Sequence, residues 1–185
     1  EEIGEFCCKT MADMGADVIR IEPPAGAQTR GIGPFYQNEE HPERSLHFWS
    51  YNLNKRSITL DLDSADGQRL LKNLVKESDI LVESAPANWM EERNIDYKTL
   101  SKINSKLIFV SISPFGRTGP HSQMHGGELV GWASSGYMYT TGWKWQKPTH
   151  PWGRQASHAA GLFAVTGAMA AIFERRRTGL GKQVD

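Results

Sequence analysis

The chain has 185 residues, of which 39% are hydrophobic, and its 21 Lys and Arg residues balance its 21 Asp and Glu residues. This composition is typical of one folded domain with a buried core, and it excludes a disordered or fibrous chain. The charge balance argues against nucleic acid or an anionic membrane surface as the main partner. The two cysteines, Cys7 and Cys8, are adjacent, which excludes an ordinary disulfide framework and a structural zinc site. We therefore expect a reducing, cytoplasmic location.

The sequence shows no pattern of a membrane span or a secretion signal. No uninterrupted apolar run approaches the roughly 18–20 residues that a membrane helix needs, and the acidic start lacks a basic flank and an apolar core. We expect a soluble protein without a membrane partner. Both ends interrupt sequence that has the pattern of a regular element, so we expect residues 1–185 to be a fragment of a longer chain.

Helix and strand patterns alternate along the first 113 residues. Helical character at 6–14 comes before the first strand, and Ser64 is a plausible cap for a helix with one apolar face. The alternation predicts an α/β fold, a mostly parallel sheet with helices on its faces. The predicted strands are 16–22, 57–62, 79–84 and 107–113.

Open sheets of this kind bind ligands at the carboxyl ends of their strands. In this chain those ends fall at residues 22–23, 83–85 and 113–116. We therefore expect a binding site along that edge of the sheet.

Residues 114–156 are rich in Gly, Trp, Tyr, His and Pro and show one helical stretch, at 128–135. Loops of this length are uncommon inside a compact domain and often have a function. Trp143, Trp145 and Trp152 lie here, and they either line a pocket for an apolar or planar ligand or pack onto the core. The sequence does not choose between these two interpretations.

A long helix is predicted from residue 157 to residue 177. It combines bulky apolar residues with a row of glycines and alanines, which lets another backbone approach closely and predicts a buried central helix. A basic, glycine-containing turn follows it, and Val184 begins a strand pattern.

Several common catalytic and binding motifs are missing from the sequence. The glycine turn at 31–34 lacks the downstream glycine and helix of a dinucleotide site, and no GxxxxGK[ST] motif is present. His121 and His125 are four residues apart in a turn-like segment, so we expect no metal site. No GxSxG elbow supports a serine hydrolase.

A basic cluster, Asn54-Lys55-Arg56-Ser57, precedes the second predicted strand. Two cations at a sheet edge are able to hold phosphates by charge and by the fork geometry of arginine. The alternative interpretation is a solvated basic turn, and the four residues alone favour it.

Six segments carry a resemblance that runs almost from end to end. They are MADMGADVIRIEPP (11–24), TRGIGPF (29–35), NLNKRSITLDLDSADGQRLLKNLVKESDILVE (52–83), SISPFGRTGP (111–120), TTG (140–142) and RRRTGLGKQVD (175–185) with the helix before it. Their order and spacing resemble the class III CoA-transferase family. That family includes formyl-CoA transferase, carnitine CoA-transferase and, as a relative, alpha-methylacyl-CoA racemase.

The resemblance implies a Rossmann-like large domain, of which residues 1–185 form the N-terminal part. It also implies a small domain absent from these residues, and two chains interlocked as rings in a homodimer. Family members transfer CoA from an acyl-CoA donor to a carboxylic acid. An aspartate at the start of the long helix attacks the thioester and forms a mixed anhydride and then an aspartyl-CoA thioester.

That aspartate position corresponds to Ser157, four residues before Gly161. Serine cannot form the anhydride, and its neighbour His158 is expected to point away from it on a helix. We expect no acid near Ser157 to complete a triad. The histidine of the racemase branch corresponds to Gly127, with Glu128 after it, so a racemase-like branch stays only as an alternative.

The resemblance also implies where CoA binds, as a ligand without a metal. The loop after the third strand differs from the family's Asn-aromatic-Arg-Pro-Gly pattern, which suggests weaker binding. Together with the basic cluster, the expected CoA-binding residues are Asn54, Lys55, Arg56, Leu60, Asp61, Leu62, Asp63, Ser84, Ala85, Pro86, Ile112, Ser113, Pro114 and Phe115.

Three hypotheses follow for the function. The first is an enzyme of this family that handles acyl-CoA and a small carboxylic acid without the aspartyl nucleophile, for example as a lyase or hydratase. The second is a catalytically silent half or subunit that pairs with an active CoA-transferase chain. The third is a CoA-binding or structural relic without turnover. Fold-level similarity alone does not choose among them.

Overall fold

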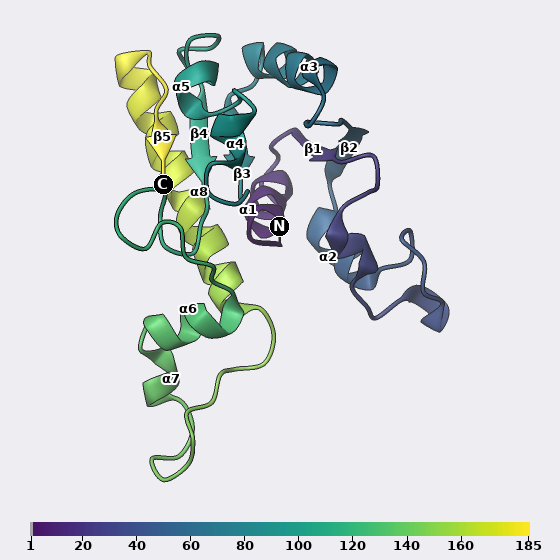
Figure 1. Cartoon of the computed structure of the whole chain (residues 1–185), viewed down its shortest axis with the longest axis vertical. Helices are drawn as coiled ribbons and strands as arrows, with labels where there is room; N and C mark the ends of the chain where they lie inside the picture. The colour runs from purple at the N-terminus through teal and green to yellow at the C-terminus, as the bar shows by residue number, and fades with distance from the viewer. Residues whose placement is uncertain (1) are drawn as a thin grey trace.

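The computed structural model describes residues 2–185, which alternate helices and strands as predicted (Figure 1). The strands are β1 Val18–Glu22, β2 Lys55–Thr59, β3 Ile80–Glu83, β4 Ile108–Ser111 and β5 Gln183–Val184. The α-helices are α1 Glu2–Asp13, α2 Leu46–Asn52, α3 Ala65–Lys76, α4 Trp89–Glu92, α5 Tyr97–Leu100, α6 Glu128–Ser134, α7 Tyr137–Thr140 and α8 Gln155–Thr178, with 3-10 turns η1 Gln28–Gly31 and η2 Tyr36–Asn38.

The strands form two parallel sheets rather than the single sheet that the sequence predicts. One sheet pairs β1 with β2, and the other has the order β3-β4-β5. Every named strand pair in residues 2–185 is parallel, which confirms the α/β prediction. Helices provide the crossovers between paired strands, because parallel neighbours cannot be joined by a tight turn.

The second strand begins and ends earlier than predicted. β2 covers Lys55–Thr59, so the strand predicted at 57–62 is present but begins two residues earlier and ends three residues earlier. A polar turn takes over at Asp61, whose carboxylate accepts from the N–H of Asp63 and whose carbonyl accepts from Ser64. Helix α2 is not predicted at all. It begins because the Ser45 hydroxyl accepts from the N–H of Phe48 and caps it.

Two apolar clusters meet at β4, which is buried on both faces. Alternate strand residues face opposite sides, so Ile108 and Val110 pack toward α1 and α8, while Phe109 packs toward α3, α4 and α5. The core is therefore continuous through one central strand. This explains why the segment around β4 is the most apolar strand in the sequence.

Helix α8 lies directly against α1, as its small residues predict (Figure 1). A Cβ at Gly161 would lie 3.0 Å from Phe6 Cδ1 and 3.3 Å from the backbone nitrogen of Cys7. A side chain there would push the two helices apart, so glycine sets their separation.

Helix α8 is also long and apolar enough to cross a membrane, by length and composition alone. This contradicts the expectation that no segment is apolar and long enough for a membrane helix. Gly, Ala and Thr residues between the bulky apolar residues of α8 extend its uncharged stretch. In the fold, α8 packs on α1, β4 and β5. The core helix of a globular domain passes the same composition test.

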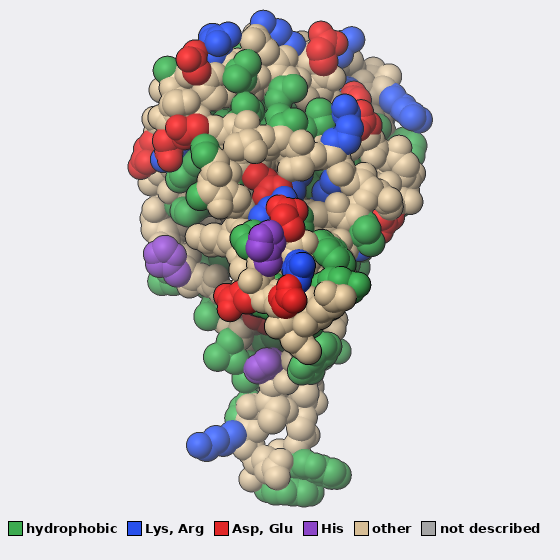
Figure 2. All heavy atoms as spheres, turned by 90° about the vertical axis from the view of Figure 1, so that its right-hand side faces the viewer, with side chains coloured by type: hydrophobic (Ala, Val, Ile, Leu, Met, Phe, Trp, Pro, Cys, Tyr) green, Lys and Arg blue, Asp and Glu red, His purple; other side chains and the backbone are tan. Residues whose placement is uncertain are grey.

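Helices α6 and α7 and the loop at 141–154 form a narrow extension (Figures 1 and 2). Hydrophobic side chains gather at its tip in the space-filling view. Trp143 and Trp145 stack with ring centroids 5.0 Å apart, yet both stay exposed, and Trp152 is 93% exposed. The interpretation that these tryptophans pack onto the core is therefore wrong, and the pocket-lining alternative stays a prediction.

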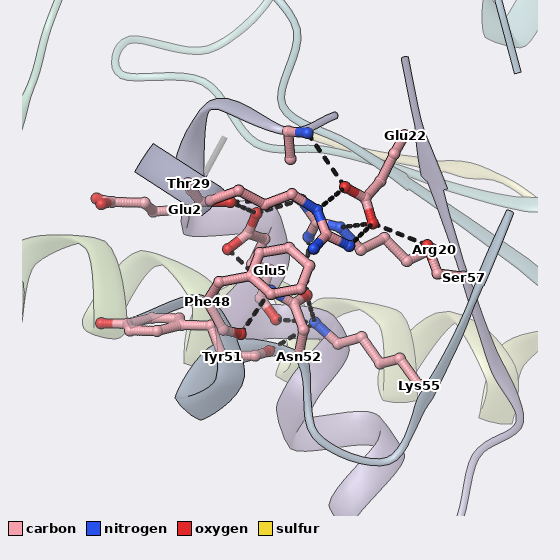
Figure 3. Close-up of polar contacts among 12 residues, drawn as sticks. Glu2, Glu5, Arg20, Glu22, Thr29, Phe48, Tyr51, Asn52, Lys55 and Ser57 are labelled. Carbon is pink, nitrogen blue, oxygen red and sulfur yellow. Dashed lines mark hydrogen bonds and ion pairs between the residues drawn. The ribbon is translucent and has the colours of Figure 1, made fainter. Parts of the chain in front are cut away.

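A buried ionic network joins α1, β1 and α2 (Figure 3). Arg20 lies 2.5 Å from Glu5 Oε1, and its Nη1 donates to Asn52 Oδ1 at 2.7 Å. The Phe48 ring lies under the guanidinium groups of Arg20 and Arg30, at 5.0 Å and 3.9 Å. The network holds the β1-β2 unit against α1.

Glu22 is the second carboxylate of this network. Burial opposes its ionisation, but hydrogen bonds from Arg30, Ser57 and the N–H of Ala27 outweigh that effect and lower the pKa of Glu22 to about 2. Only 4% of its side chain is exposed. Folding therefore favours the ionised carboxylate strongly.

We expect this carboxylate to make stability depend on pH. Since the folded pKa lies below the ordinary value of 4.5, the stabilisation is present above pH 4.5 and is lost as the pH falls toward 2. The shift corresponds to about 3 kcal/mol at pH 6. Urea unfolding at pH 6 and pH 3 should show Glu22→Gln destabilised more at pH 6. An equal deficit at both pH values would contradict the assignment. Glu43→Gln, the exposed partner of Arg30, is the matched control.

Candidate functional site

Ser157 lies in the first turn of α8 and contacts a carboxylate from α6. Its hydroxyl donates to Glu128 Oε2 at 2.8 Å, and its N–H donates to the same oxygen at 3.1 Å. The N–H of Ala156 and the indole N–H of Trp132 donate to Oε1, at 2.5 Å and 3.0 Å. The prediction that no acid lies near Ser157 is therefore wrong.

Glu128 acts in this geometry as a cap for α8. Burial opposes its ionisation, but the N–H groups of Ala156 and Ser157 and the Ser157 hydroxyl outweigh burial and lower the pKa of Glu128. A carboxylate held ionised at a helix N-terminus is a weak base. The pair thus fixes the serine hydroxyl as a donor and does not activate it as a nucleophile.

The sequence gives only an indirect sign of this contact. Glu128 follows two glycines at the start of a predicted helix, and helix α6 then packs on α8. Nothing in the local pattern of either segment indicates that residues 128 and 157 meet, because 29 positions separate them.

A second group of polar aromatic residues lies beside the same helix end, and the sequence gives no sign of it. A hydrogen bond of 2.5 Å joins the Tyr51 hydroxyl to His158 Nε2, and His158 stacks on Phe6 at 4.2 Å. His47 stacks on Tyr51 with ring centroids 4.5 Å apart, and its Nε2 lies 3.2 Å from Glu2 Oε1. Burial, with the nearby Glu2 carboxylate, raises the pKa of Tyr51. His158 therefore packs toward α1 and α2, while Ser157 contacts α6.

The basic cluster lies inside β2 and its preceding turn, so its predicted place before the strand is wrong. The Lys55 ammonium donates to the carbonyls of Glu5 and Tyr51, both at 2.8 Å, and to Asn52 Oδ1 at 2.9 Å. Burial lowers the pKa of Lys55 to about 8. Arg56 forms a solvent-exposed ion pair with Asp17, and the Asn54 side-chain amide donates to the Asp13 carboxylate.

The fold separates this cluster from residues 60–63. Lys55 begins β2 and Leu60 follows its last residue, so five steps of extended strand, about 16 Å, separate the two residues. The three Lys55 contacts also use all three of its ammonium protons. The cluster and residues 60–63 therefore lie at opposite ends of one strand.

Two of the predicted CoA-binding segments do come together. Leu62 and Ala85 pack on the same apolar cluster, and Arg93 pairs with Asp63 while its guanidinium lies 4.1 Å above the Trp89 ring. A Cβ on Gly67 would lie 1.8 Å from the Asp61 carbonyl oxygen, so glycine at 67 lets this turn lie on α3. The turn after β2 and the loop after β3 thus form one surface.

The third predicted segment, 112–115, follows β4 beside this surface. Ile112 is buried, and its N–H donates to the Glu83 carbonyl at 2.9 Å. Residues 110–113 line a hollow of about 340 Å³ with residues from α8 and the end of β5. It lies at the carboxyl ends of parallel strands, where ligands of such sheets bind.

Residues with metal-binding side chains do not gather in the described part of the chain. Among residues 2–185, no three His, Cys, Asp or Glu side chains are placed to hold one ion. His125 is exposed in its loop.

Comparisons with known proteins identify the family. The model of CoA-transferase family III matches residues 3–185. Over 184 residues the chain is 36% identical to succinyl-CoA:(R)-benzylsuccinate CoA-transferase subunit BbsE of Thauera aromatica, covering 100% of this chain and 45% of that protein. It is 36% identical to succinyl-CoA:glutarate CoA-transferase of Mus musculus, covering 98% of this chain and 41% of that protein.

The structural match agrees with these sequence matches. A CAIB/BAIF family protein from Brucella suis aligns with a TM-score of 0.92 at 33% identity, over 99% of this chain and 48% of that one. The chain thus spans less than half the length of each of these three proteins. Together, the match to the family model and the similarity to these relatives show that the chain belongs to CoA-transferase family III.

Proposed function

We propose that the protein containing this chain takes part in CoA transfer between an acyl-CoA thioester and a small carboxylic acid. In this proposal the present polypeptide binds the CoA thioester, and a second family III polypeptide supplies the carboxylate nucleophile. The observation that carries the proposal is the Ser157–Glu128 contact, in which the hydroxyl at the nucleophile position donates to a carboxylate with a lowered pKa.

The electronic demands of the reaction support a nucleophile from outside this chain. Anhydride formation needs a carboxylate free to attack the thioester carbonyl. Glu128 places a carboxylate at the N-terminal end of α8, where the nucleophile is expected. It already accepts hydrogen bonds from Trp132, Ala156 and Ser157. Its attack would remove the charge that these donors stabilise.

The relatives support pairing and a dicarboxylic substrate. BbsE is named as a subunit, and both curated relatives named above use succinyl-CoA. On α8, Phe163 is 79% exposed and Phe173 is 69% exposed, which leaves apolar surface for a second chain to cover. An interlocked pair in the cytoplasm, where free Cys7 and Cys8 stay reduced, is part of this proposal.

The test asks which polypeptide carries the covalent intermediate. The complete protein, isolated with whatever remains bound, is incubated with succinyl-CoA and glutarate and then treated with hydroxylamine. Hydroxylamine converts an aspartyl thioester to a hydroxamate that peptide mass spectrometry locates. We expect the hydroxamate on an aspartate of a second polypeptide and none on this chain. A labelled residue in this chain, or full transfer by this polypeptide alone, would contradict the proposal.

A further inference from the structure

Arg117 connects three segments at the carboxyl edge of the β3-β4-β5 sheet. Its guanidinium donates to both carboxylate oxygens of Glu83, and to the carbonyl oxygens of Ala85 at 3.0 Å and Pro86 at 3.2 Å. Its backbone N–H donates to Asp185 Oδ2 at 2.7 Å. One residue therefore joins the end of β3, the loop after β3 and the residue that follows β5.

The contact between Arg117 and Glu83 is shielded from water. Only 13% of the Arg117 side chain and 7% of the Glu83 side chain are exposed. Glu83 Oε2 also accepts from the N–H of Ala85 at 2.8 Å, so the carboxylate holds the start of the loop directly. A planar guanidinium contacts the carboxylate and two carbonyls together, which a lysine ammonium on a flexible stem does not reproduce.

These segments border the hollow of about 340 Å³ at the ends of β4 and β5. Gly116 and Asp185 line it. Gly116 precedes Arg117 in the sequence, and Asp185 accepts a hydrogen bond from the Arg117 backbone N–H. Ser113 also lines it, and its buried Oγ has no hydrogen-bond partner among residues 2–185. A buried hydroxyl without a partner is a group that a polar ligand would satisfy.

We propose that Arg117, oriented by Glu83, is a positioning residue for CoA binding that fixes the loop at 84–88 against the loop at 112–117. This inference rests on the proposed function, because it assigns CoA to this edge of the sheet. The loop at 84–88 contains neither arginine nor glycine. Arg117 supplies a guanidinium to that loop from the adjacent loop at 112–117. The loop at 84–88 is therefore ordered before CoA binds.

The chain offers a control at the opposite end of the same sheet, where an arginine holds a more exposed carboxylate. Arg175 lies 2.7 Å from Asp79 Oδ1 and donates to the carbonyls of Asp79 and Lys106, at 3.3 Å and 3.0 Å. Its side chain is 18% exposed. It therefore also holds a carboxylate and two carbonyls, but just before β3 and β4 instead of after them.

The experiment compares Arg117→Lys, Glu83→Gln and Arg175→Lys in the complete protein. Calorimetric titration gives the Kd for CoA, thermal unfolding gives Tm, and hydrogen exchange without CoA reports on the loops at 84–88 and 112–117. We expect Arg117→Lys and Glu83→Gln to bind CoA about tenfold more weakly and to exchange faster in these loops, because preorganisation is lost. Arg175→Lys should lower Tm less, because its partner Asp79 is 79% exposed, and should keep the wild-type Kd.

The outcomes separate this inference from the proposed function. If wild type binds CoA and Arg117→Lys binds it equally well while folded, the positioning role is overturned. Equal losses of affinity in Arg117→Lys and Arg175→Lys would overturn it too, since both would then reflect stability. If wild type gives no heat with CoA, the proposed function fails and the CoA role of Arg117 fails with it. The hydrogen-exchange rates then show whether Arg117 and Glu83 hold the loops at 84–88 and 112–117 in place.

Discussion

Ser157→Asp is expected to form a covalent CoA adduct on this chain when it is incubated with succinyl-CoA, whereas the wild-type chain forms none. The substitution restores a carboxylate at the position where class III CoA-transferases are expected to have their nucleophile. Aspartate is able to attack the thioester and become first an anhydride and then a thioester, which serine is not. Mass spectrometry after hydroxylamine treatment measures the adduct directly.

The neighbouring carboxylate gives this variant a second expected property. Ser157 Oγ lies 2.8 Å from Glu128 Oε2, so an aspartate there places two carboxylates side by side and loses the hydroxyl donor. Like charges so close raise the pKa of one of them. We expect Ser157→Asp to lose about 1–3 kcal/mol of stability at neutral pH. The loss should become smaller as the pH falls through the raised pKa.

Ser157→Asn is the matched control for both properties. It has the same size as aspartate and no carboxylate, so neither an adduct nor a pH-dependent loss is expected. An adduct on wild type would show that another residue of this chain is the nucleophile. An inert aspartate variant that still binds acyl-CoA would show that the site lacks more than one group.

Arg20→Met is expected to lose about 3–5 kcal/mol of unfolding free energy, which is a large part of the total for a domain of this size. The side chain of Glu5 is only 4% exposed and lies 2.5 Å from Arg20. Burial opposes its ionisation, but the Arg20 charge and the Thr29 hydroxyl outweigh that effect and lower the pKa of Glu5. Without Arg20, the protein buries a carboxylate that has lost its cation. Urea unfolding of the complete protein measures the loss.

Arg56→Met is the control for this prediction. Arg56 pairs with Asp17 on the surface, where the side chains are 65% and 72% exposed and water screens the interaction. We expect a loss below about 1 kcal/mol. Similar losses for Arg20→Met and Arg56→Met would mean that the buried network contributes no more than a surface pair.

The sequence by itself determined the local elements and the family. Strand β4 and helix α8 were predictable because their signals are local, a continuous apolar run and a long stretch of small and bulky apolar residues. The order of short motifs was enough for the family resemblance, which the match over residues 3–185 confirms. Helix α2 was not predictable, since its cap Ser45 follows a polar loop without helical periodicity.

Only the tertiary structure decided which side chains meet. Ser157 contacts Glu128 and Arg117 contacts Glu83, 29 and 34 positions away in the sequence, and one of the three Lys55 contacts reaches Glu5, 50 positions away. Hydrophobic periodicity carries no information about such contacts. Lys55, one of the basic residues that suggested a phosphate site, instead donates hydrogen bonds inside the fold. Its buried ammonium requires acceptors, and the protein supplies them. Local pattern sets the elements, whereas the chemistry at the helix end depends on how α6 and α8 pack.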